Sequence, residues 1–372
     1  MIKKFLEYIR ITPKALVVVV ILLIAVDGIV RLYWANLYRT PGRVRLVNQE
    51  LATLQTMRNE IRTAEGYRIL FLGNSAAYGS AVRNGGQTVP AYLEQELNRR
   101  FPDKQVKVFN FAFKGYGTSE NYFLLNSLKD SGLDMVIYNV SINWFNRDKA
   151  LEHPNVVRLS DSYFWEPFVV RTGVLPPRTD KEKINDKVNE IMGRVWSLYQ
   201  NRSAITNIIL GKSLRSMLSD LQLAVINPGE LVRLHREEAD LFSPWYWKDW
   251  SVKLGKAGYI VGKIDLSDDN PQVVFYNLIQ EISVRKKIKA LIYTSPQNFT
   301  LLNRYKMLDL PAWTVSIEEL RDMTVKGITF KDFSTLVDDR YFSDTVHLLA
   351  RGNKLVALQL AENISQQWGG TD

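Results

Sequence analysis

The chain has 372 residues, 46% of them hydrophobic, and contains no cysteine. This composition supplies a full core, is unlike that of a disordered chain, and excludes disulfides, thiolate metal sites and a cysteine nucleophile. The net charge is +9, but residues 1–45 alone hold eight Lys or Arg against Glu7 and Asp27. The basic excess therefore flanks one apolar segment, and we expect no nucleic-acid partner.

A short basic tail, residues 1–14, precedes an apolar segment that we assign to residues 15–34. A membrane-spanning helix needs about 20 residues. This segment reaches that length only by including Asp27 and Arg31. The two side chains are four residues apart, so on a helix they can pair, or Arg31 can extend to the membrane interface. We predict a transmembrane helix here.

This apolar segment has two interpretations. Tyr33 and Trp34 suit the aromatic belt of a membrane interface, which favours an uncleaved anchor. A cleaved signal peptide also has a basic start and an apolar centre, but no A-x-A-like site follows the run. We therefore favour the anchor. Similar numbers of Lys and Arg lie on both sides of it, so charge does not set its orientation.

Residues 35–66 are predicted to form a juxtamembrane helix after a break at residues 40–42, Thr-Pro-Gly. Their apolar side chains recur at helical spacing, at Val47, Leu51, Leu54, Met57 and Ile61. The stripe is too short for a firm coiled-coil prediction. We expect it to pack on the chain's own domain.

Buried-strand patterns and amphipathic helices alternate in residues 67–150 and again in residues 275–368. The predicted strands are 68–72, 105–109, 134–140 and 288–294, and the predicted helices are 89–101, 119–131, 273–285 and 352–367. Such alternation predicts a parallel sheet covered by helices on both faces. Residues 151–274 break the rhythm with Pro-rich and charged stretches, so we predict a mostly helical insertion there.

Ser75 follows the first predicted strand, in the stretch LFLGNSAAYG of residues 70–79. Gly, Asn and Ser favour turns, so a turn serine is the simplest interpretation. An open parallel sheet, however, places its ligands at the carboxyl ends of its strands, where Ser75 is expected to lie. Ser75 is therefore also a candidate nucleophile, which needs a neighbouring base because its hydroxyl is weakly nucleophilic.

The chain has three histidines, and His347 lies three residues after Asp344. An Asp-x-x-His step just before a helix can bring the carboxylate to the imidazole Nδ1 and leave Nε2 free to act as general base. The two residues predict a triad of Ser75, His347 and Asp344.

Four blocks of the sequence, taken in order, resemble those of the SGNH or GDSL hydrolases. The blocks are Gly73-Asn74-Ser75, the stretch from Asn110 to Gly115, Ser141-Ile142-Asn143-Trp144, and the stretch from Asp344 to His347. The resemblance covers residues 67–150 and about residues 275–367. It implies an SGNH-type, flavodoxin-like three-layer α/β sandwich with a parallel central sheet. It also implies ester chemistry through an acyl-serine intermediate.

The resemblance further implies an oxyanion hole made by the backbone N–H groups of Ser75 and Gly115 and the side-chain amide of Asn143. One such preorganised donor contributes around 3 kcal/mol to catalysis. The sequence departs from the family's pattern at two places. Asn74 stands where the family usually has Asp, and Trp144 follows Asn143 where it usually has another Asp. We expect Trp144 to line a differently shaped substrate pocket.

Two further features lie outside these blocks. Asn298 follows a predicted strand and should lie on the same sheet edge as Ser75, so we expect it to contact the substrate. The aromatic cluster at 242–250 is compatible with core packing, with sugar stacking or with membrane contact, and core packing is the default. The sequence has no metal-ligating motif, and we expect neither metal nor cofactor.

These observations predict a membrane-anchored, single-pass SGNH-type serine esterase or O-acyltransferase with an extracytoplasmic domain, in the periplasm or at the cell surface. The resemblance implies acyl groups of envelope or exported polysaccharide, or another ester, as substrate, and a membrane acyltransferase as a candidate partner. The alternative is a non-catalytic SGNH-fold binding or assembly module of an envelope polysaccharide system. In that case the unusual third block reflects lost activity.

Overall fold

The structure is a computed structural model that describes residues 13–46, 48–146, 153–159, 179–205, 240–251 and 260–369. Most of the predicted tail, residues 1–14, and much of the predicted insertion, residues 151–274, lie outside the described residues. The description below concerns the remaining parts of the chain.

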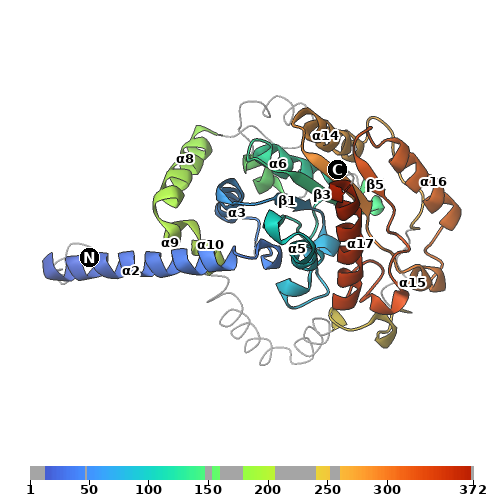
Figure 1. Cartoon of the computed structure of the whole chain (residues 1–372), viewed down its shortest axis with the longest axis horizontal. Coiled ribbons are helices and arrows are strands. Elements are labelled where there is room, and N and C mark those ends of the chain that lie inside the picture. The colour runs from blue at the N-terminus through green and yellow to red at the C-terminus, as the bar shows by residue number, and fades with distance from the viewer. Residues whose placement is uncertain are drawn as a thin grey trace.

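A five-stranded parallel sheet forms the centre of the domain (Figure 1). Its strands are β1 (Arg68–Leu72), β2 (Lys107–Asn110), β3 (Met135–Val140), β4 (Lys289–Thr294) and β5 (Thr329–Lys331), in the spatial order β2-β1-β3-β4-β5. Every pairing is parallel, with Leu70 opposite both Phe109 and Val136. The predicted parallel sheet is therefore confirmed. β5 was not predicted, because it has three half-buried residues and no apolar run.

Helices cover both faces of the sheet, as the alternating pattern predicts. The helices of the domain are α3 (Leu51–Thr63), α4 (Ser75–Tyr78), α5 (Val89–Arg100), α6 (Thr118–Leu128), α14 (Pro271–Arg285), α15 (Phe299–Arg304), α16 (Leu310–Asp322) and α17 (Ala350–Gly369). Alternate residues of β1 face opposite layers. Ile69 and Phe71 pack with α5 and α17, while Leu70 and Leu72 pack with α3, α6, α14 and α16.

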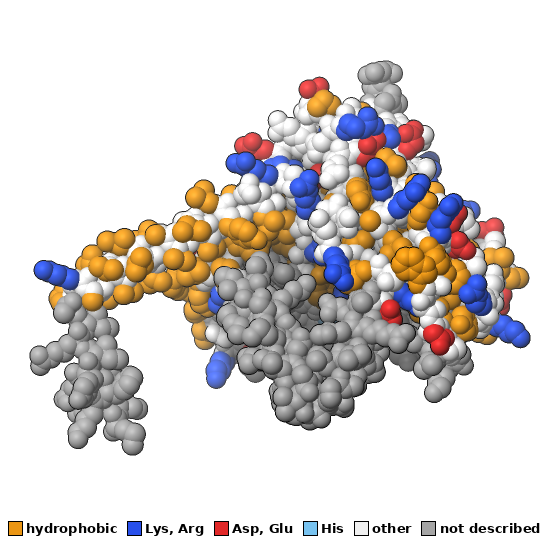
Figure 2. Space-filling view, turned by 90° about the horizontal axis from the view of Figure 1, so that it is seen from below, with side chains coloured by type: hydrophobic (Ala, Val, Ile, Leu, Met, Phe, Trp, Pro, Cys, Tyr) orange, Lys and Arg blue, Asp and Glu red, His pale blue; other side chains and the backbone are white. Residues whose placement is uncertain are grey.

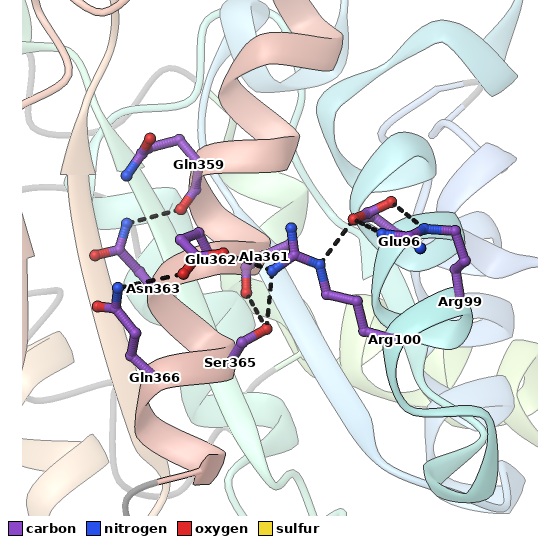
Figure 3. Close-up of polar contacts among 9 residues, drawn as sticks. All are labelled: Glu96, Arg99, Arg100, Gln359, Ala361, Glu362, Asn363, Ser365 and Gln366. Carbon is purple, nitrogen blue, oxygen red and sulfur yellow. Dashed lines mark hydrogen bonds and ion pairs between the residues drawn. The ribbon is translucent and has the colours of Figure 1, made fainter.

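Helices α5 and α17 are joined at the surface by charged side chains (Figure 3). The guanidinium of Arg100 donates to Glu96 on its own helix and to Glu362 and Ser365 on α17. Exposed ion pairs of this kind contribute about 0–1 kcal/mol each. The apolar contacts beneath them therefore provide most of the attraction between these two helices.

Helix α2 (Pro13–Leu37) is long and apolar enough, by length and composition, to cross a membrane. Most of its length projects away from the domain, and its apolar side chains there are exposed (Figures 1 and 2). Its last turns differ from the prediction. Trp34 is buried with Tyr38 in the core of the domain and does not join an exposed aromatic belt, whereas Tyr33 is exposed.

The segment after α2 is packed on the domain. A 3₁₀ turn, Pro41–Arg43, replaces helix at the predicted break, and α3 begins only at Leu51. Val47 of the predicted stripe lies outside the described residues. The N–H of Gly42 donates to the carboxyl of Glu94 on α5 (3.2 Å). A Cβ on Gly42 would lie 2.7 Å from the carbonyl oxygen of Pro90, so only glycine fits this close approach.

Three helices come from the predicted insertion: α8 (Asp180–Val195), α9 (Ser197–Gln200) and α10 (Arg202–Ile205). Of these, α9 packs against α2, while α8 and α10 contact α9 and α3. Asp27 and Arg31 of α2 form the expected ion pair, with 2.7 Å between Nε and Oδ2. Both residues also bond to the region where α8 ends and α9 begins. The N–H of Leu198 donates to Asp27 (2.7 Å), and Arg31 donates to the carbonyl of Val195 (2.8 Å).

Candidate active site

Ser75 lies at the carboxyl end of β1, where the chain turns sharply into α4. A Cβ on Gly73 would lie 2.7 Å from the Cβ of Ala77 and 2.9 Å from the Cβ of Asn139, so glycine is required by close packing. The side chain of Asn74 accepts a hydrogen bond from the N–H of Ala76 (2.9 Å) and caps α4. An Asn cap of this kind is worth about 1 kcal/mol, and it accounts for Asn at this position without a role in chemistry.

The structure brings Ser75, His347 and Asp344 together. The Nε2 of His347 lies 2.8 Å from the hydroxyl oxygen of Ser75, and its Nδ1 lies 2.6 Å from Oδ2 of Asp344. Asp344 Oδ1 accepts hydrogen bonds from the N–H groups of Val346 (2.9 Å) and His347 (2.7 Å). With Nδ1–H donating to the carboxylate, Nε2 is an acceptor directed at the serine hydroxyl.

The electrostatics of this trio suit a general base. Burial alone would raise the pKa of Asp344, but the charge of His347 and the hydrogen bonds from its ring and from two backbone N–H groups lower that pKa to about 2. Burial opposes the charged form of His347, and Lys114 and Lys248 do so as well, yet Asp344 raises the pKa of His347 above its usual value. Asp344 therefore stays ionised and stabilises the imidazolium.

The loop that carries Gly115 lies beside the Ser75 turn. The N–H of Phe113 donates to the carbonyl of Gly73 (3.4 Å), and the ring of Phe113 meets the ring of Tyr78 edge to face at 5.4 Å. Gly115 has φ of +86°, a conformation that glycine adopts without strain. Ser75 begins α4, so its N–H belongs to the first turn, where helical N–H groups have no intrahelical acceptor.

Asn143 and Trp144 lie on the 3₁₀ helix Ile142–Asn146, which follows β3. Asn143 is exposed and Trp144 is half-buried. A Cβ on Gly117 would lie 3.4 Å from Cε3 of Trp144, so the indole lies against the loop that carries Gly115. The oxyanion role of Asn143 and the pocket role of Trp144 stay predictions.

Asn298 occupies a different position from the one expected of a substrate contact. Its side chain is fully buried and caps α15 by accepting from the N–H of Leu301 (3.0 Å). Its amide donates to the carbonyl of Asp344 (3.2 Å), and its backbone N–H donates to the carbonyl of Thr345 (2.9 Å). We therefore correct its role: Asn298 holds the loop that carries Asp344 and does not face the substrate.

The aromatic cluster at 242–250 is divided between core and surface. Trp245 and Trp250 are buried in the core beside α17, in agreement with core packing, while Tyr246 and Trp247 are exposed. The N–H of Trp245 donates to the carbonyl of Phe342 (3.0 Å), and Lys248 donates to the hydroxyl of Ser343 (2.8 Å). This segment thus lies against the loop that leads to Asp344.

The sequence did not reveal three residues that surround the trio. Lys114 and Lys248 lie near His347, and Asn121 of α6 connects the Ser75 turn to the Gly115 loop. The position of Lys114 next to Gly115 in the sequence was a signal for Lys114. Asn121 on a helix and Lys248 in an irregular segment offer no such signal. Among the described residues, no group of three or more His, Asp or Glu side chains could hold a metal ion.

No protein-family model and no curated protein sequence matches the chain. Solved structures do match it. A carbohydrate acetylesterase family member from Sinorhizobium meliloti has 12% identity and a TM-score of 0.30, over 82% of this chain and 99% of that one. A GDSL-like lipase from Bacteroides thetaiotaomicron has 10% identity and a TM-score of 0.36, over 86% and 100%. A family two carbohydrate esterase from Clostridium thermocellum, in complex with cellohexaose, has 12% identity and a TM-score of 0.33, over 82% and 65%. At these identities and TM-scores, the matches support no conclusion about the activity or substrate of this chain.

The strand order β2-β1-β3-β4-β5 and the helices on both faces define a flavodoxin-like, three-layer α/β sandwich with a parallel central sheet. In this sandwich the serine turn after β1 meets the Asp-x-x-His step before α17. The fold implied by the resemblance to the SGNH or GDSL hydrolases is thereby confirmed.

Proposed function

We propose that this chain is a membrane-anchored SGNH-type serine esterase or O-acyltransferase. The observation that carries the proposal is the continuous hydrogen-bonded path from the Ser75 hydroxyl through His347 to Asp344, with separations of 2.8 Å and 2.6 Å. A serine that only forms a turn does not require a hydrogen-bonded histidine and aspartate. A nucleophile requires it, because the base must take the hydroxyl proton as the new bond forms.

In the proposed reaction, Ser75 Oγ attacks the ester carbonyl and His347 Nε2 takes its proton. The tetrahedral intermediate collapses when the C–O bond to the alcohol breaks, and His347 returns the proton to the leaving oxygen. Water or a sugar hydroxyl then attacks the acyl-serine and gives its proton to His347. The bond between the acyl carbon and Ser75 Oγ breaks, and His347 returns the proton to Oγ, which restores the enzyme. The N–H groups of Ser75 and Gly115 and the amide of Asn143 would donate to the oxyanion in both steps.

The substrate class and location follow from the resemblance and from α2. A helix able to span a membrane supports an anchored domain, and we propose that this domain lies outside the cytoplasm. There it would act on acyl groups of envelope or exported polysaccharide. The exposed rings of Tyr246 and Trp247, on a segment that contacts the Asp344 loop, suit stacking on a sugar ring.

The decisive experiment is intact mass spectrometry of the detergent-solubilised full chain after treatment with a fluorophosphonate, a probe that reacts with activated serines. We expect one adduct on the native chain and none on Ser75→Ala or His347→Ala. Ser80→Ala is the matched control, since Ser80 lies just after α4 and outside the trio, and it should keep the adduct.

An unmodified native chain with a folded circular dichroism spectrum would contradict the proposal. The non-catalytic binding or assembly module would then be the better reading. If the adduct forms, the ratio of hydrolysis to acyl transfer onto an added oligosaccharide separates esterase from transferase.

A further inference from the structure

Helix α8 carries an apolar stripe that the described part of the domain leaves uncovered. Residues at spacings of three and four lie on one face of a helix. In α8 these are Ile184, Val188, Ile191 and Val195, with exposed fractions of 66%, 49%, 51% and 72%. Lys181 and Lys187, both exposed, lie at the two edges of the stripe. Apolar side chains exposed together in this way mark an interaction surface.

The opposite face of α8 is the one that holds it to the protein. Glu182 lies two helical turns from Asn189 on that face. Glu182 forms an ion pair with Arg158 (3.5 Å), and Asn189 accepts hydrogen bonds from Tyr199 (2.5 Å) and Arg202 (3.4 Å). The helix begins with a capping box between Thr179 and Glu182. The orientation of α8 is therefore fixed by polar contacts, and the apolar stripe points outward.

The position of α8 relative to α2 indicates what covers the stripe. Val195, at the end of α8, accepts from Arg31, and Leu198 donates to Asp27, so α8 ends beside the last turns of the apolar segment of α2. Figure 1 shows that α8 runs crosswise to α2 and forms the edge of the domain toward which the exposed part of α2 projects. A helix crosswise to a membrane-spanning helix lies in the plane of the membrane.

We propose that α8 is an interfacial helix whose apolar stripe inserts into the lipid bilayer beside α2, an inference that rests on the membrane anchoring in the proposed function. Amphipathic helices of this kind bury their apolar face about 5–10 Å into the boundary between headgroups and acyl chains. Flanking lysines extend to the headgroups and keep their charge in water. The apolar side chains of α2 are exposed as well, and lipid must cover those in any anchored state.

The absence of cysteine from the chain allows a direct test. Single cysteines replace Val188 on the stripe, Val19 on α2 and Val315 on α16, whose native side chains have exposed fractions of 49%, 50% and 52%. Each full-length variant is labelled with an environment-sensitive fluorophore and reconstituted into vesicles of phosphatidylcholine and phosphatidylglycerol. Some vesicles contain lipids with a nitroxide quencher near the headgroup, and others contain lipids with the quencher near the chain end.

We expect the label at Val188→Cys to be blue-shifted and quenched most strongly by the shallow nitroxide. The label at Val19→Cys should be quenched by the deep nitroxide, and the label at Val315→Cys by neither. If Val188→Cys behaves like Val315→Cys while Val19→Cys is quenched, α8 does not contact lipid and the inference is overturned although the anchor stands. If only Val188→Cys is quenched, α8 binds the membrane and the proposed anchor fails. If neither is quenched, both proposals fail.

Discussion

The side-chain oxygen of Asn121 accepts a hydrogen bond from the backbone N–H of Gly73, with a separation of 2.9 Å. The amide nitrogen of the same side chain donates to the carbonyl of Gly117 (2.5 Å). One buried amide on α6 therefore joins the turn that presents Ser75 to the loop that carries Gly115. The relative position of the nucleophile and a proposed oxyanion donor depends on this amide.

Replacing Asn121 with Ala should impair both stability and activity. The change leaves the buried N–H of Gly73 without its partner, and an unsatisfied group of this kind costs about 1–3 kcal/mol. It also removes the shorter of the two hydrogen bonds that the carbonyl of Gly117 accepts from residue 121. We expect a comparable loss in the free energy of unfolding, measured in urea, and a lower kcat with p-nitrophenyl acetate. Asn126→Ala on the same helix is the control. Equal kcat values for the two variants would show that Asn121 does not position the site.

Replacing Asn298 with Ala tests its corrected role. Displacing the Asp344 loop should lower kcat by about 10- to 100-fold, as small misplacements of reacting groups do, with little change in KM. Asn303→Ala, an exposed position on the same helix α15, should leave both constants unchanged. A raised KM with unchanged kcat would instead restore Asn298 as a substrate contact.

Activity should depend on the protonation of His347, which acts as a base only when neutral. Because Asp344 raises the pKa of His347, kcat/KM should increase with pH through a midpoint above 6.5. Asp344→Asn removes the negative charge, so it should shift the midpoint down and lower kcat by on the order of 10⁴-fold, as in serine proteases. Lys114→Gln removes an opposing positive charge, so it should shift the midpoint up. A pH profile of ester hydrolysis measures the midpoint for the native chain and for each of the two variants.

The stability of the fold should fall between about pH 4.5 and pH 7 because of Glu94. Burial raises the pKa of Glu94 from 4.5 to about 7, although hydrogen bonds from Val108 and Gly42 act against that rise. The unfolded chain releases this proton at lower pH than the folded chain, so the free energy of unfolding decreases as pH rises through this window, by up to roughly 3 kcal/mol.

Urea unfolding at pH 5 and pH 8 measures this loss, and Glu94→Gln should reduce it. Glu96 on the same helix is a matched control, because its pKa is shifted in the opposite direction. Hydrogen bonds from Arg99 and Arg100 lower its pKa to about 2, so its contribution is present above about pH 4.5 and is lost toward pH 2. Glu96→Gln should leave the difference between pH 5 and pH 8 unchanged. An unaltered difference in Glu94→Gln would contradict the role of Glu94.

The sequence predicted the features of the site that depend on spacing along the chain. Ser75 follows a buried strand, and Asp344 and His347 are three residues apart, so the local pattern was enough to identify the serine and the Asp–His pair. The order of the four family-like blocks then joined them into one predicted triad. The same reasoning was insufficient for Asn298, because the end of a strand does not determine which way the next side chains point. Asn298 turns inward to cap α15.

Tertiary contacts decided the remaining differences. Trp34 is in a segment of membrane-like composition, but packing against Tyr38 and the domain buries it. Asn121 makes its contacts with residues 48 positions earlier and four positions earlier, and neither contact leaves a periodic signal in the sequence. β5 forms because it pairs with β4, and three residues are too few to show a strand pattern.

The end of α2 is held firmly to the domain. Trp34 and Tyr38 are buried in its core, and the N–H of Gly42 donates to Glu94 on α5. In the proposed anchored state the domain would not swing on a tether. It would diffuse and rotate in the membrane plane together with its anchor, and Ser75 would stay at a nearly constant height above the lipid. The polymer that carries the acyl groups would then have to bring them to that height. The mobility of the substrate, and not that of the enzyme, would decide which acyl groups Ser75 reaches.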